Sequence, residues 1–280
     1  MPVYATPQPI TVTIDLAIAN LRIIASDRTD TIVEVRPSKD TRAADVKAAE
    51  RTRVEYSNGR LLVKGPKQRL LFGRNESINV TIELPAGSHV NGAVAWGEFR
   101  AEDRLGECRF HTDMGDLSLD QTGRLNLTNG YGNVTVDRVV GHADITAGSG
   151  AVRIREIDGS ATIKNSNGNT TIGEVTGELR LNAANGDISI DRTLTLVTAK
   201  TANGNIRIGE VVRGSILLET AYGKLEVGIR EGTAAWLDVS SQYGKVRNSL
   251  RAHDGPQQSD ETAEVRARTG YGDIRIYRST

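Results

Sequence analysis

From about residue 96 onward, apolar and polar residues alternate in short runs. Typical runs are NGDISI, NGNIRI and YGDIRI, in which Ile occupies every second position of the final part. A period of two is the period of a β-strand, so one face of each run is expected to point into a core. The pattern predicts a long series of short, half-buried strands.

A glycine precedes each run, and its spacing is nearly constant. From Gly115 to Gly223, successive glycines of this series lie 17 to 19 residues apart, and a second series, including Gly141 and Gly159, lies half a period away. Self-similarity at a fixed period is the signature of a repeat architecture. Glycine can adopt the positive φ of a tight corner, where a Cβ would clash. We assign structural corner positions to Gly115, Gly132, Gly150, Gly168, Gly186, Gly204, Gly223, Asn167, Asn185 and Asn203.

Two architectures fit this repeat. A solenoid winds once per period, whereas a meander of antiparallel hairpins turns at the Asn–Gly pairs. We favour the solenoid, because one full period recurs almost without drift and places like residues in columns. The expected fold is an all-β, single-stranded parallel β-helix with about 18 residues per turn, and the crossover rule predicts that it is right-handed.

One column of the coil combines amides and aromatic rings. Asn167, Asn185 and Asn203 are expected to form a ladder of side-chain amides, each bonded to the next. Tyrosines occupy the same column in other turns, and we expect them to stack on one another, with a ligand platform as the alternative. These tyrosines are Tyr131, Tyr222, Tyr243 and Tyr271.

The repeat does not cover the whole chain. Residues 1–95 lack the period but alternate strongly, which predicts a β-rich N-terminal cap or small sandwich, with one short helix within Asp40–Thr52. Residues 96–280 form the β-helix repeat region. In it, a polar loop is expected at about residues 249–264, followed by a closing strand at Asp273–Tyr277 that could cap the coil.

Composition limits the partners. The 280 residues include 35 Lys and Arg against 35 Asp and Glu, so no excess of positive charge draws the chain to nucleic acid. No apolar run is long enough to span a bilayer, and the first residues lack the features of an export signal, so we expect a cytoplasmic protein without direct membrane insertion.

Candidate chemistry is sparse. Cys108, the sole cysteine, stands beside no evident base and is expected to pack inside the coil. Asp113, Asp116 and Asp120 form the densest acidic group, with His111 nearby, but alternation spreads them along an outer face, so we expect surface acids rather than a calcium site. No metal-ligand spacing or phosphate-binding loop is present, and we expect no cofactor and no catalytic residue.

With this repeat in view, the chain resembles the Toastrack family of bacterial β-strand-repeat proteins, a family of unknown function whose members are also labelled candidate adhesins. The resemblance rests on NGDISI, NGNIRI and YGDIRI at near-constant spacing and on TIELPAGSHV before the first turn, and it covers nearly the whole chain. We expect similar sequences among actinobacteria such as streptomycetes. The resemblance implies a β-helix with an interaction or envelope-associated role and transfers no catalytic residue.

Together these patterns predict a non-enzymatic scaffold or protein-interaction module. A stiff coil with repeated outward columns suits binding to a protein partner, whose identity the sequence does not reveal, or self-association through the β-helix ends. The alternative is a carbohydrate-binding or polysaccharide-active β-helix, which requires a groove with clustered acidic, Arg and aromatic residues.

Overall fold

The computed structural model describes residues 2–66, 76–250 and 261–279. These residues form 26 β-strands and one nine-residue α-helix. The chain divides into two compact units, Met1–Val140 and Gly141–Thr280. In both, parallel strands stack turn upon turn, so the expected all-β solenoid is confirmed and the antiparallel hairpin meander is wrong for the repeat.

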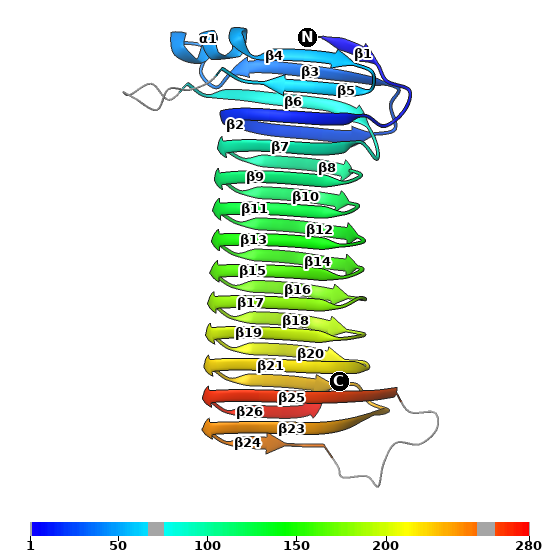
Figure 1. Cartoon of the computed structure of the whole chain (residues 1–280), viewed down its shortest axis with the longest axis vertical. Helices are drawn as coiled ribbons and strands as arrows, with labels where there is room; N and C mark the ends of the chain where they lie inside the picture. The colour runs from blue at the N-terminus through cyan, green and yellow to red at the C-terminus, as the bar shows by residue number, and fades with distance from the viewer. Residues whose placement is uncertain (1, 67–75, 251–260, 280) are drawn as a thin grey trace. The chain divides into compact units, whose positions relative to one another are not determined.

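The first unit contains the helix and the strands β1 to β12 (Figure 1). Their bounds are β1 Val3–Ala5, β2 Thr11–Ser26, β3 Asp30–Pro37, α1 Ala43–Arg51, β4 Arg53–Ser57, β5 Arg60–Lys64, β6 Ile78–Pro85, β7 His89–Trp96, β8 Phe99–Arg104, β9 Cys108–Met114, β10 Leu117–Thr122, β11 Leu125–Tyr131 and β12 Val134–Val140. The predicted helix within Asp40–Thr52 is thus present as α1.

The second unit contains the strands β13 to β26 (Figure 1). Their bounds are β13 Ala143–Ser149, β14 Val152–Asp158, β15 Ala161–Asn167, β16 Thr170–Val175, β17 Leu179–Asn185, β18 Ile188–Thr193, β19 Val197–Asn203, β20 Ile206–Val211, β21 Gly214–Tyr222, β22 Leu225–Ile229, β23 Thr233–Tyr243, β24 Val246–Asn248, β25 Glu261–Tyr271 and β26 Ile274–Arg278.

Each turn of the second unit has one strand in each of two facing sheets. Ile172 of β16 lies beside Ile190 of β18, which lies beside Ile208 of β20, and all three are fully buried. The spacing of 18 residues therefore equals one turn, and like side chains fill the interior in columns. Burying such a side chain contributes roughly 1.5–3 kcal/mol, so these columns supply much of the driving force for folding.

The long strand β2 of the first unit is inserted into the coil. Residues 11–15 of β2 lie between β5 and β7, and residues 21–25 lie between β6 and β8, in parallel on every side. Parallel coil pairing therefore reaches back to residues 11–26, although no repeat glycine marks this segment. The boundary at residue 95 remains a prediction about independent domains.

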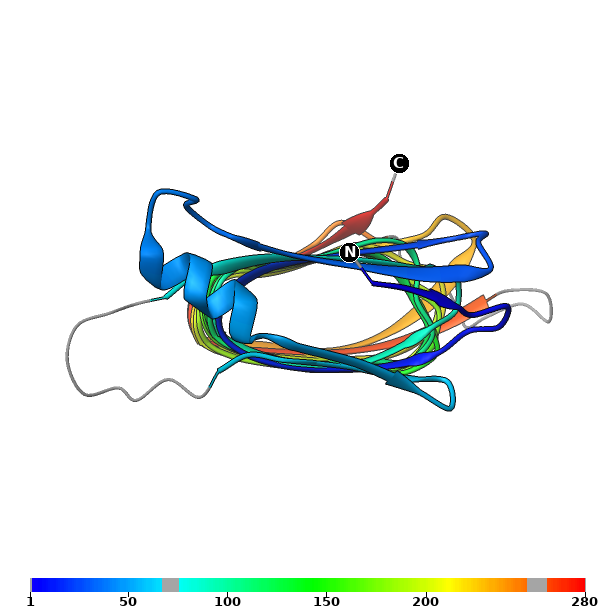
Figure 2. The same cartoon turned by 90° about the horizontal axis from the view of Figure 1, so that it is seen from above.

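The N-terminal end of this coil carries antiparallel strands. β4 pairs antiparallel with β5, β3 with β6, and β1 with β3. The helix α1, drawn as a coiled ribbon in Figure 2, joins β3 to β4. It packs against β3 and β6, with Ala48 and Asp45 buried. The Oδ1 atom of Asp45 accepts the backbone N–H of Ser77 at 3.0 Å. The coil thus ends here under a helix and reversed strands.

A second insertion occurs in the second unit. β25 lies between β21 and β23, and β26 lies between β22 and β24. The prediction that the last strand caps the coil is therefore wrong, because that strand fills an interior layer. The predicted loop at 249–264 is shorter than expected at its C-terminal side, since β25 begins at Glu261, and its residues 251–260 lie outside the described residues.

Candidate functional site

The last turn of the second unit, formed by β23 and β24, is the surface that departs most from the rest of the coil. We call it the terminal turn. β23 pairs along one side with β25, and β24 along one side with β26. Within residues 2–66, 76–250 and 261–279, no strand pairs with the other side of either strand. An unpaired parallel edge offers a row of backbone N–H and C=O groups to an added strand.

The inward positions of this turn are incompletely covered. Leu237 and Val239 point inward but are only half-buried, whereas Val265 and Ala267, beside them in β25, are fully buried. In the other sheet Val246 is 45% exposed, although Ile274 beside it is 0% exposed. The apolar interior of the coil is therefore open to solvent at this end.

An exposed tryptophan lies on the outer face of the same turn. Trp236 of β23 is 57% exposed, and the guanidinium carbon of Arg266 lies 5.8 Å from its ring centroid. Arg266 also pairs with Glu264 at 2.7 Å. Trp236 and Glu264 line a hollow of about 510 Å³, which the small residues of β21 leave open, namely Gly214 and Ser215.

The column at the corner is both an amide ladder and a tyrosine stack. The Nδ2 of Asn185 donates to Oδ1 of Asn167, and the Nδ2 of Asn203 donates to Oδ1 of Asn185, each at 2.9 Å. The rings of Tyr222 and Tyr243 stack on either side of Tyr271, at centroid distances of 4.9 and 4.7 Å. Because the ring faces contact one another, they leave only one outer ring face, that of Tyr243, for a ligand platform.

Tyr131, placed in the same column by its sequence, belongs to the first unit. It lies beside Met114, which lies beside Trp96, and all three are exposed. This short apolar ridge lies at the corner of three successive turns. Exposed apolar residues in one row are a feature of contact surfaces.

The corner glycines lie where the sequence puts them. Six of them, Gly115, Gly132, Gly150, Gly168, Gly186 and Gly204, have φ between +129° and +154°. At Gly223 close approach is the constraint, because a Cβ there would lie 1.9 Å from the carbonyl oxygen of Gly204. Backbone stacks on backbone at this corner without room for a side chain.

A column of buried polar residues, which the strand pattern did not predict, lies three positions before the corner glycines. Asn165 donates from Nδ2 to the carbonyls of Gly150 and Gly168, and Thr220 donates from its hydroxyl to the carbonyl of Gly204. These side chains satisfy carbonyls that the corner turns inward. A recurring Asn or Thr at this offset from the glycine was the available signal.

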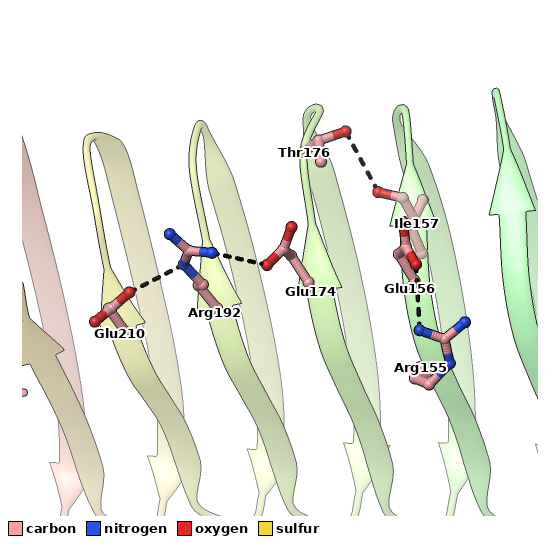
Figure 3. Close-up of polar contacts among 7 residues, drawn as sticks. All are labelled: Arg155, Glu156, Ile157, Glu174, Thr176, Arg192 and Glu210. Carbon is pink, nitrogen blue, oxygen red and sulfur yellow. Dashed lines mark hydrogen bonds and ion pairs between the residues drawn. The ribbon is translucent and has the colours of Figure 1, made fainter.

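Charged residues on the outer faces are arranged in pairs across turns. Arg192 of β18 donates to Glu210 of β20 at 3.0 Å and to Glu174 of β16 at 3.1 Å (Figure 3). In the first unit the side-chain hydrogen bond from Arg22 holds the pKa of Glu102 below its ordinary value. In both ladders the arginine occupies the carboxylate oxygens.

The three aspartates of the acidic group predicted from the sequence each contact a different partner. Asp113 contacts His111 at 3.1 Å, Asp116 accepts the backbone N–H of Asn133, and Asp120 accepts that of Asp103. In the described part of the chain, no three His, Cys, Asp or Glu side chains gather as a metal site would require.

Cys108 is fully buried, as expected, and burial raises the pKa of its thiol to about 12. A thiol in this state is a packing residue and a poor nucleophile. Its chemistry therefore contributes nothing to a site. No helix in the described residues is long and apolar enough to cross a membrane.

Comparison with known proteins places these features in a family. The family model described as Toastrack DUF4097 matches residues 11–279. No curated protein matches the chain in sequence.

Similar solved structures include a candidate lipid-binding protein from Parabacteroides distasonis ATCC 8503, 12% identical with a TM-score of 0.43, over 98% of this chain and 95% of that one. A candidate adhesin from Bacteroides fragilis NCTC 9343 is 11% identical with a TM-score of 0.29, over 98% and 95% of the two chains. A candidate adhesin from Parabacteroides merdae ATCC 43184 is 13% identical with a TM-score of 0.32, over 98% and 94%. With TM-scores below 0.5, these likenesses carry no argument about function.

Proposed function

This chain belongs to the Toastrack DUF4097 family, and we propose that it is a non-enzymatic scaffold that binds a protein partner through its terminal turn. The observation that carries the proposal is the unpaired edge of β23, with the half-buried Leu237 and Val239 behind it. A partner strand added to this edge would satisfy its backbone groups and cover these side chains together.

The exposed aromatic residues suit a protein contact. Trp236 and Tyr243 are 57% and 58% exposed, at opposite ends of the same strand. Trp, Tyr and Arg are enriched among the residues that dominate binding energy. Trp and Tyr bury large areas at a low cost in side-chain entropy. The strand between them supplies the backbone hydrogen bonds.

The absence of catalysis is part of the proposal. Carboxylates on the outer faces form ion pairs, as Glu174 and Glu210 do with Arg192. General acid–base work needs two such groups free on either side of one substrate bond. A cytoplasmic location is likewise proposed, and cell fractionation with an antibody to the chain would check it.

The test compares capture by three forms of the full chain from an extract of its native cells. Val239→Lys places a charge at the open interior, whereas Ser240→Lys places the same charge on the outer face of the same strand. We expect a partner retained by the wild type and Ser240→Lys and lost with Val239→Lys. Equal capture by all three forms would overturn the proposed site.

The hollow beside Trp236 favours a second candidate function, binding of a neutral sugar. The apolar face of a pyranose can stack on an exposed indole while Glu264 and Arg266 bond to its hydroxyls. In a Trp96→Phe background, the fluorescence of Trp236 reports on this hollow alone. A saturable change on titration with neutral oligosaccharides, lost in Glu264→Ala, would support it, and an unchanged spectrum at millimolar sugar would contradict it.

A further inference from the structure

We propose that the partner at the terminal turn is a second copy of this chain, joined end to end so that the two β23 strands pair antiparallel about a twofold axis. This inference rests on the proposed function, because it names the occupant of the same edge. It makes the scaffold a closed dimer with a core that continues from one copy into the next.

The shape of the opening points to this occupant. Its rim consists of one strand from each of the two facing sheets, β23 and β24, and apolar residues point inward from both, Leu237 and Val239 on one side and Val246 on the other. A single added strand would cover one side only. A coil with the same two-sheet cross-section covers both, and the same end of a second copy has that cross-section by definition.

The N-terminal end of the chain does not offer a matching surface. Its outermost strands, β1 and β4, run antiparallel to their neighbours, and α1 packs over β3 and β6. Head-to-tail stacking would therefore set a helix against the open interior. Because the contact joins like ends, it closes after two copies and does not propagate into a filament.

The composition of β23 is that of a buried strand. Proteins protect a free edge with Lys, Pro or inward charges, and the sequence TAAWLDVSSQY contains neither Lys nor Pro. Its one charged residue, Asp238, points outward and is paired with Arg268 at 3.3 Å. By contrast, the exposed edge strand β4 carries Arg53 and Glu55 in five residues. β23 lacks the features that keep an edge unpaired.

The first measurement is the mass of the full chain by sedimentation velocity over a range of concentrations. We expect a dimer in the wild type and in Ser240→Lys, and a dissociation constant at least about a hundredfold higher for Val239→Lys, since each dimer would bury the new charge twice. Thermal unfolding of the three forms at a concentration where all are monomeric shows whether Val239→Lys is folded.

The second measurement is cross-linking of chains in which no charge has been added to β23. Cys108 is buried with a raised pKa, so the wild type has no reactive thiol to interfere. We expect a short bismaleimide to link Ser240→Cys into covalent dimers and to leave Asn182→Cys, exposed on β17, largely unlinked.

A chain that stays monomeric at the highest concentration, with Ser240→Cys linked no more than Asn182→Cys, would overturn the dimer. Capture of a different protein that Val239→Lys abolishes would then leave the proposed function standing with another partner. Loss of both results would remove the proposed function together with the inference.

Discussion

The side-chain amide of Asn185 donates a hydrogen bond to that of Asn167 across 2.9 Å, between two residues that are 18 positions apart in the sequence. Asn203 repeats the contact one turn later. Asn185 therefore donates to Asn167 and accepts from Asn203, so the polarity of the ladder is the same at both steps. The contact fixes the stacking of three turns at an exposed corner.

We predict that Asn185→Asp destabilises the chain, because a carboxylate cannot donate to Oδ1 of Asn167. The expected loss is about 1 kcal/mol in the free energy of unfolding, measured by denaturant titration. Asn182→Asp is the matched control, since it lies on the same strand beside Lys164 and Lys200 and should cost nothing. Equal losses in both variants would show that the ladder does not contribute.

A methyl group at Gly204 should be far more costly. Gly204 has φ +154°, and its Cβ would lie 2.0 Å from the carbonyl oxygen of Gly186. We expect Gly204→Ala to lose more than about 3 kcal/mol. Gly232→Ala separates the steric clash from the backbone strain, because Gly232 has φ +80° with no atom within 4 Å of a Cβ. This variant should lose only about 1 kcal/mol in the free energy of unfolding, through backbone strain alone. Similar losses would contradict the steric account.

The buried amide of Asn165 should be replaceable by a hydroxyl and not by a carboxylate. Thr201, Thr220 and Thr269 hold the same position in other turns and donate to the corner carbonyls. We expect Asn165→Thr to cost less than about 1.5 kcal/mol, and Asn165→Asp to cost several times more at pH 7.

The loss with Asn165→Asp should shrink as the pH falls, because burial raises the folded-state pKa of such a carboxyl and favours its neutral form. Urea titrations at pH 7 and pH 4 measure both effects. A loss independent of pH would show that shape, and not charge, sets the cost.

Glu102 should contribute to stability at neutral pH. Its pKa is lowered by the hydrogen bond from Arg22, so its contribution is present above the unfolded pKa and is lost as the pH falls through the lower folded value. We expect Glu102→Gln to lower stability near pH 7 and to match the wild type near pH 2.

Glu231→Gln, at an exposed turn, is the control for that comparison. Thermal unfolding from pH 7 to pH 2 should give converging curves for Glu102→Gln and the wild type. Curves that stay separated at the lowest pH would show that the substitution acts through packing.

The sequence predicts the local structure of the repeat well because each turn carries the same physical constraints. Ile190 must face inward, and Gly186 must leave room for a backbone above it, whichever turns lie on either side. Such constraints act within about 18 residues, and periodicity makes them visible. The Asn ladder follows from the same periodicity.

The order in which the turns stack cannot be predicted from this local pattern. The segment ETAEVRARTGYGDIRI has the strand, Tyr–Gly corner and strand of any other turn, so its sequence does not show that it lies between two earlier ones. The place of β2 in the coil could not be predicted for another reason. This strand passes from one sheet to the other at Ile18 and Ala19 without a corner glycine. The open terminal turn, and hence the candidate site, depends on that order and could not be predicted.

The insertion of β25 and β26 sets when the second unit can be completed during synthesis. Gly214 of β21 pairs with Ala263, so the layer that follows β21 and β22 is made of residues that leave the ribosome after β23 and β24. Until they emerge, β23 and β24 lack the layer that lies beside them in the folded unit, and native turn-by-turn winding cannot continue past β22. Vectorial growth can build the earlier turns, but the second unit acquires its final strand order only after β25 and β26 have been synthesised.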